Sequence, residues 1–130
     1  VMEFSVNHPL PEGPDARYAE HLAAGRLCVQ RCKGCERHIF YPRLLCPHCH
    51  GEDLDWVGVS GKGTVYATTV IRRRPEQGPP YNLCLVELDE GFRMPSRVEG
   101  VEPETVRVGM AVTARITQQD GADIVVFDPS

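Results

Sequence analysis

The hydrophobic positions in the first part of the chain predict one short helix, over residues 15–24. Tyr18 and Leu22 are four residues apart and therefore share one face of that helix. Asp15 can cap its start, and Gly25 suits the left-handed conformation that commonly follows a helix. Because a helix of this length is not stable alone, its apolar face must pack either on its own chain or on a partner protein. The sequence leaves both alternatives open.

The pattern changes after Gly51, where alternating and β-branched segments predict a series of strands. Gly61 and Gly63 interrupt the first long run, and a glycine bulge there would let a long strand curl into both halves of a small barrel. Pro95 marks an edge strand or a bulge. About five strands predict a mainly β protein with a five-stranded OB-fold barrel. The first long strand is interrupted between 54–60 and 64–73, and the others are 81–91, the weaker 92–100, 110–119 and 122–130.

Three parts follow from these patterns: a Pro/Gly-rich arm with the short helix at residues 1–25, a cysteine-containing ribbon at 26–53 and the barrel at 54–130. The first residues show no basic segment followed by an apolar run, and no apolar run is long enough to span a membrane. We therefore expect a cytoplasmic protein with no membrane partner. In a reducing compartment, paired C-x-x-C motifs usually bind metal.

A candidate metal site lies in the ribbon, where four cysteines are spaced as C-x2-C-x10-C-x2-C. Four thiolates form a closed tetrahedral site that has no open position for substrate, so the metal is structural. Iron is the competing metal, because rubredoxins use the same four sulfurs, but the short spacing forms only a hairpin and favours zinc. We expect one zinc per chain. The ligands are Cys32, Cys35, Cys46 and Cys49, whereas Cys28 and Cys84 are expected to be buried.

Charge is distributed unevenly along the chain, although the net charge is only -4. Residues 26–49 contain five Arg/Lys and one acid, and residues 85–130 contain nine acids and four arginines. Either these are two solvated surfaces, or the basic part faces an anionic ligand or partner.

No catalytic motif is visible in the sequence. It contains no G-x-S-x-G, no phosphate-binding glycine loop and no H-E-x-x-H. The close carboxylates Asp53/Asp55 and Asp89/Glu90 lie in turn-like segments. We therefore expect no activity from the chain alone.

Several stretches together resemble a known family: "GRLCVQRCKGCERHIFYPRLLCPHCH", "LDWVGVSGKGTVYATTVIRR", "PYNLCLVELDEG", "VRVGMAVTARI" and "VVFDPS". They are similar to the zinc-ribbon/OB-fold, acyl-CoA-associated proteins of domain of unknown function family 35. Two positions depart from the family pattern. Glu36 stands where Gly is frequent, and Tyr41-Pro42-Arg43 stands where Pro-Pro-Arg is frequent.

The resemblance implies a rubredoxin-like zinc ribbon, an OB-fold barrel and a role as partner of thiolase-fold enzymes. These enzymes include thiolases and the lipid-transfer-protein-like aldolases of steroid degradation, so lipid or steroid metabolism is implied. The helix and ribbon are expected to contact the enzyme, and the barrel to bind or guide acyl-CoA. Candidate partner contacts are Tyr18, Leu22, Tyr41 and Arg43, and candidate acyl-CoA ligands are Arg72, Arg73 and Arg74, which otherwise are a solvated strand end.

Two other functions remain open at this point. Ribbons and OB barrels also bind nucleic acid, but the barrel half is acidic and has few aromatic side chains, which disfavours it. An iron-containing electron carrier is the third hypothesis.

Overall fold

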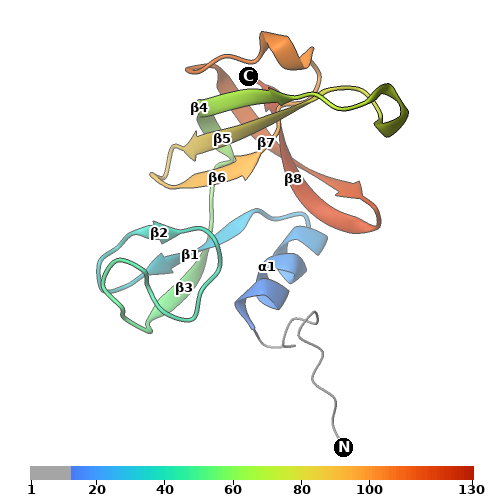
Figure 1. Ribbon diagram of the computed structural model, residues 1–130. Coiled ribbons are helices and arrows are strands. Elements are labelled where there is room, and N and C mark those ends of the chain that lie inside the picture. The colour runs from blue at the N-terminus through green and yellow to red at the C-terminus, as the bar shows by residue number, and fades with distance from the viewer. Residues whose placement is uncertain (1–12) are drawn as a thin grey trace, which may run out of the picture.

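The computed structural model describes residues 13–130 and shows one short helix, a small three-stranded sheet and a five-stranded sheet (Figure 1). Most of the arm predicted at residues 1–14 lies outside the described residues. The mainly β fold class is confirmed. In the described part, no helix has both the length and the apolar character that crossing a bilayer requires.

Helix α1 (Pro14–Ala23) begins one residue earlier than predicted and is not capped by Asp15. Gly13 is the N-cap, without a side-chain hydrogen bond, and Pro14 occupies the first turn. Asp15 instead lies inside that turn, where its charge favours the helix dipole. Gly25 has φ +80° as expected, and its N–H donates to the Leu22 carbonyl at 2.9 Å, which ends the helix.

The helix packs on its own chain, which is one of the two alternatives that the sequence left open. Leu22 is only 4% exposed and belongs to the main core, and Tyr18 packs against that core. The Tyr18 ring meets the Phe40 ring edge-on, with 5.6 Å between centroids. Leu22 therefore has almost no surface left to offer a partner.

The ribbon sheet has the order β2-β1-β3 with antiparallel pairs. The third strand of this sheet begins at residue 54, where the barrel was predicted to begin, and Gln30 of β1 pairs with Trp56 of β3. Alternation in a strand predicts which side chains share a face and does not identify the neighbouring strand. The strands are β1 (Cys28–Cys32), β2 (His38–Ile39) and β3 (Leu54–Gly58).

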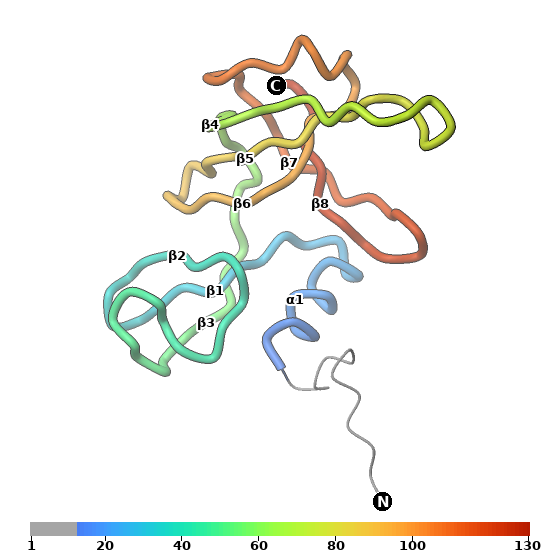
Figure 2. The backbone as a smooth tube through the Cα atoms, in the orientation of Figure 1, coloured from blue at the N-terminus to red at the C-terminus, as the bar shows by residue number. Residues whose placement is uncertain are grey.

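The barrel sheet has the order β6-β5-β4-β7-β8, all antiparallel. β6 is an edge strand, as Pro95 predicted. A parallel bridge between Val98 and Phe127 brings the two ends of the sheet together. Figure 2 shows the β4–β5 hairpin projecting from the barrel. The elements are β4 (Lys62–Ile71), η1 (Pro75–Gln77), β5 (Tyr81–Leu88), β6 (Arg93–Ser96), η2 (Pro103–Thr105), β7 (Ala111–Gln119) and β8 (Ala122–Pro129).

The bulge in the long first barrel strand is not at the glycines. The register between β4 and β5 shifts between Val65 and Ala67, so Tyr66 is the extra residue. Gly63 has a different role, since a Cβ there would lie 2.6 Å from the Glu87 carbonyl oxygen. It allows β4 and β5 to approach closely.

One hydrophobic core joins the helix, ribbon and barrel. It includes Leu22 and Val29 from the first half of the chain, and Val65 and Phe127 from the barrel. Phe92 of the barrel also lies against the ribbon, with its ring 6.1 Å from His38. The ribbon is therefore fixed on the barrel by shared packing.

Candidate metal centre and neighbouring surfaces

The four predicted metal ligands converge in the ribbon. Their sulfurs all lie within 4.8 Å of one another. The sulfurs of Cys32 and Cys49 are 3.5 Å apart, and those of Cys35 and Cys46 are 3.6 Å apart. A tetrahedral zinc with bonds of about 2.3 Å requires sulfur separations of about 3.8 Å, so the donor set fits zinc closely.

Two similar turns create this geometry. In the first, the Glu36 N–H donates to the Cys32 carbonyl at 2.8 Å, and in the second the His50 N–H donates to the Cys46 carbonyl at 2.8 Å. Glu36 has φ +63° and His50 has φ +62°. Left-handed backbone favours glycine, which gives a physical reason for the glycine that is frequent at the Glu36 position.

The electrostatics of the four thiols favour a bound cation. Burial raises the pKa of Cys46, but the backbone N–H groups of Cys49 and His48 outweigh it and lower the pKa to about 6. The Gly51 N–H lowers the pKa of Cys49, yet the neighbouring thiols and burial raise it to about 11. Four sulfurs this close cannot all be ionised without a positive ion, which metal binding supplies. Such a closed site stabilises the ribbon and has no position for substrate.

The two other cysteines are buried, as predicted. Cys28 is part of β1 and Cys84 part of the barrel core. Burial raises the pKa of the Cys84 thiol to about 11, so it is a poor nucleophile at neutral pH.

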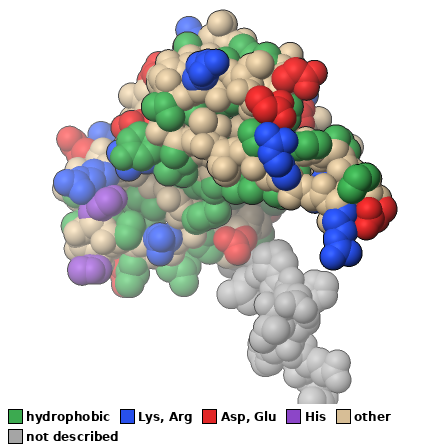
Figure 3. Space-filling model, turned by 45° about the horizontal axis from the view of Figure 1, so that its top comes forward, with side chains coloured by type: hydrophobic (Ala, Val, Ile, Leu, Met, Phe, Trp, Pro, Cys, Tyr) green, Lys and Arg blue, Asp and Glu red, His purple; other side chains and the backbone are tan. Residues whose placement is uncertain are grey.

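Beside the metal centre, the ribbon presents an exposed apolar loop, which we define as Tyr41, Leu44 and Leu45. Leu44 is 75% exposed. The buried side chain of Gln30 holds this loop in place through two hydrogen bonds. Its Nε2 donates to the Arg43 carbonyl at 2.7 Å, and its Oε1 accepts the Arg43 N–H at 2.6 Å. Figure 3 shows Lys, Arg and His side chains interspersed with hydrophobic side chains on this side of the molecule. The predicted contacts Tyr41 and Arg43 both lie at the surface here.

The three candidate acyl-CoA arginines all lie at the exposed end of the β4–β5 hairpin but do not converge on one point. Arg72 pairs with Glu104 at 3.7 Å. Arg73 donates through Nε to the Pro79 carbonyl at 2.9 Å, and its guanidinium lies 4.9 Å from the Tyr81 ring. Arg74 donates its backbone N–H to Gln77 Oε1 at 3.3 Å. They therefore offer positive charge at the surface without a preformed cradle.

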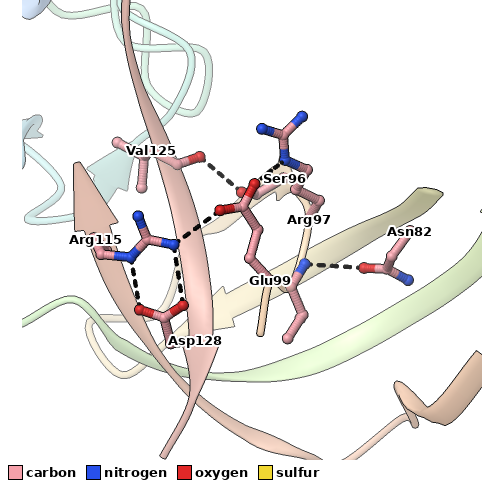
Figure 4. Close-up of polar contacts among 8 residues, drawn as sticks. Asn82, Ser96, Arg97, Glu99, Arg115, Val125 and Asp128 are labelled. Atoms are coloured by element: carbon pink, nitrogen blue, oxygen red, sulfur yellow. Dashed lines mark hydrogen bonds and ion pairs between the residues drawn. The ribbon is translucent and has the colours of Figure 1, made fainter. Parts of the chain in front are cut away.

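An apolar groove of about 230 Å³ begins beside these arginines, at Tyr81. It lies between the edges of β6 and β8, and polar contacts hold this seam (Figure 4). Ser96 Oγ donates to the Val125 carbonyl at 2.8 Å, and Asn82 Oδ1 accepts the Val98 N–H at 3.0 Å. The apolar lining residues are Tyr81, Leu83, Pro95, Ile124, Val125 and Val126.

An ion-pair network crosses the same seam. Arg115 of β7 pairs with Asp128 and with Glu99, each at 2.8 Å, and Glu99 also binds Arg97 at 2.8 Å. Figure 4 shows these side chains converging from β7, β8 and the segment after β6. The network is not predictable from the sequence, because it depends on the closure of the barrel.

Two family models match this chain: the rubredoxin-like zinc ribbon domain of ChsH2 at residues 19–55 and the C-terminal OB-fold domain of ChsH2 at residues 56–117. A DUF35 domain-containing scaffold protein of Methanocaldococcus jannaschii is 36% identical over 102 residues, which cover 74% of this chain and 72% of the relative. The chain belongs to the DUF35 family. The zinc ribbon match and the four converging sulfurs confirm one structural zinc in this family member.

Other similar proteins are parts of larger enzymes or complexes. A probable enoyl-CoA hydratase alpha subunit of Thermomonospora curvata is 38% identical over 119 residues, which cover 89% of this chain and 37% of the relative. The DUF35 chain thus spans little more than a third of that protein. The present chain also resembles a chain of the solved Ltp2-ChsH2(DUF35) aldolase. The TM-score is 0.78 and the identity 32%, and the match covers 94% of this chain and 98% of that chain.

Proposed function

We propose that this DUF35 chain is a non-catalytic accessory subunit that binds a thiolase-fold enzyme and helps it bind or channel acyl-CoA, in lipid or steroid metabolism in the cytoplasm. The observation that carries the proposal is the exposed apolar loop of Tyr41, Leu44 and Leu45, which Gln30 holds in place. The similarity to a chain of an aldolase complex supports it.

The loop has the properties of a protein-binding surface. Three large apolar side chains on one short loop are costly to expose to water, and such patches commonly mark interaction sites. The loop is ordered before binding, because both backbone polar groups of Arg43 are bound to Gln30. A preorganised loop loses less conformational entropy when a partner covers it.

The acyl-CoA role rests on the arginines and the groove together. Arg73 lies over Tyr81, and Tyr81 lines the apolar groove. An anionic CoA phosphate near Arg72–Arg74 and an acyl chain along the groove would therefore use adjacent surfaces. This arrangement suits an acyl-CoA ester better than it suits a purely polar ligand.

Nucleic-acid binding receives less support from the surface. The guanidinium of Arg93 lies 3.7 Å from the Tyr66 ring, and that of Arg73 lies near Tyr81. These exposed tyrosines already have cationic stacking partners, whereas single-strand binding proteins offer open aromatic faces to bases.

Reconstitution tests the proposal. The chain alone, a thiolase-fold enzyme from the native host and the mixture of both are assayed with acyl-CoA. We expect activity from the mixture and none from the isolated chain. Turnover by the chain alone would overturn the non-catalytic assignment.

The acyl-CoA part is tested separately in the complex by changing Arg72, Arg73 and Arg74 together to Glu. The apparent KM for acyl-CoA should rise while zinc content and assembly stay unchanged. An unchanged KM in a normally assembled complex would show that these arginines are only a solvated strand end.

A further inference from the structure

Strand β5 carries apolar side chains on both of its faces, with Asn82 and Glu87 as its polar positions. Its inward positions form part of the core or its border, and Asn82, Cys84, Val86 and Leu88 are all buried. Three successive outward positions are also apolar, at Tyr81, Leu83 and Leu85. A sheet with one solvated face normally places polar side chains outward, and apolar residues on both faces are typical of a strand that is covered twice.

Neighbouring strands extend this apolar surface. Across the sheet, Leu85 is paired with Pro95 of β6 and with Ala67 of β4, and Tyr81 is paired with Ile71. Paired residues project from the same face. Leu83, at the centre, is 45% exposed. We define the outer sheet face by the residues Ala67, Ile71, Tyr81, Leu83, Leu85 and Pro95.

Positive charge borders the outer sheet face. Arg93 lies over Tyr66 on one side, and Arg73 lies over Tyr81 on the other. Glu87 is 4.0 Å from Arg93 and pairs with it, whereas Arg73 donates to the Pro79 carbonyl. The complementary surface is therefore apolar at its centre and acidic at its rim.

We propose that the outer sheet face is a second docking surface for the partner enzyme, which would cover the groove that begins at Tyr81. This inference rests on the proposed function and adds a location to it. A second copy of this chain is a poorer occupant, because a two-fold contact would place the same basic rim on both sides. The partner is expected to present apolar side chains flanked by Asp or Glu.

The test compares Leu83→Glu with the matched control Val108→Glu, which changes an exposed apolar side chain outside the outer sheet face. Zinc content and circular dichroism establish that both variants are folded. Affinity for the partner enzyme is measured by isothermal titration calorimetry. We expect at least a tenfold loss of affinity for Leu83→Glu and no change for Val108→Glu. Arg93→Glu should also weaken binding of the partner enzyme. The affinity of this variant should depend less on salt concentration than the affinity of the wild type does.

Three results would overturn the inference. If Leu83→Glu binds the partner enzyme as tightly as the wild type but has a raised KM for acyl-CoA, the outer sheet face binds only the ligand. A dimer of the isolated chain that Leu83→Glu dissociates would assign it to self-association. Equal losses in both variants would make the effect nonspecific. Failure of the wild-type chain to bind the enzyme at all would instead refute the proposed function, so the two failures are distinguishable.

Discussion

Gln30 and Arg43 form a two-point contact in which one buried side-chain amide binds both backbone polar groups of the other residue, at 2.7 and 2.6 Å. Gln30 is 5% exposed and lies in β1 of the ribbon sheet. Because a buried polar group is costly unless it is bonded, this contact determines where the apolar loop lies. The metal ligand Cys46 directly follows Leu45, so metal and amide together hold the apolar loop of Tyr41, Leu44 and Leu45.

Replacing Gln30 with Leu should leave the Arg43 N–H and carbonyl without their partners. We expect a loss of about 1–3 kcal/mol in the free energy of unfolding of the zinc-loaded protein. Urea denaturation measures it. The matched control is Gln118→Leu, which removes an exposed amide contact to Asp123 and should change stability by about 0.5 kcal/mol or less. Equal stability of the two variants would contradict a stabilising role for the contact between Gln30 and Arg43.

Replacing Cys46 with Ser should release the metal and unfold the ribbon, since metal binding and folding are linked at such sites. Elemental analysis should give one zinc per wild-type chain and a large loss in the variant. Cys84→Ser serves as a control, because this residue is buried away from the metal cluster and should leave the zinc content unchanged. A coloured protein that contains iron would contradict the zinc assignment.

Replacing Glu36 with Gly should stabilise the ribbon. Glu36 adopts φ +63°, and a residue with a Cβ is strained there by roughly 1–2 kcal/mol. The lost pairing with Arg31, at 3.9 Å between exposed side chains, is worth little. We expect a gain of about 1 kcal/mol in the free energy of unfolding. A destabilised Gly variant with full zinc occupancy would show that the left-handed turn does not limit stability.

Alkaline pH should destabilise the protein through Tyr18. Burial, assisted by the nearby Tyr41, raises the pKa of Tyr18 from its ordinary 10.0 to about 12. The folded chain therefore holds this proton more tightly than the unfolded chain. The resulting stability is fully present below pH 10 and is lost as pH rises toward 12. We expect a loss of about 2 kcal/mol over this interval.

Tyr18→Phe isolates that contribution, because other groups titrate in the same range. The difference in unfolding free energy between wild type and Tyr18→Phe should change across pH 10–12, with wild type losing more. Parallel pH profiles would show that Tyr18 is not buried as the structure shows.

The zinc site was predictable because its information is local. Two C-x-x-C turns bring their sulfurs together by backbone geometry alone, and Gly25 ends the helix for an equally local reason. The edge position of Pro95 follows from its missing N–H. Such features depend on a few neighbouring residues and need no knowledge of the tertiary fold.

Features that depend on long-range packing could not be derived in this way. The pairing of β3 with the ribbon, the bulge at Tyr66 and the core position of Leu22 each require knowledge of which segments meet. The contact between Gln30 and Arg43 joins residues that are 13 positions apart. In the sequence alone, Gln30 looks like an ordinary polar residue in a strand. Burial decides its role, and burial is a property of the whole molecule.

The mass of the purified complex tests the central claim most directly. The chain and a thiolase-fold enzyme from the native host are co-expressed with a tag on the enzyme only, and the eluted species is measured by light scattering after size exclusion. We predict a stable hetero-oligomer with a fixed ratio of the two chains, which dissociates or weakens when Leu44 is changed to Glu. Elution of the chain at its free mass, with the enzyme alone in the tagged fraction, would contradict the account.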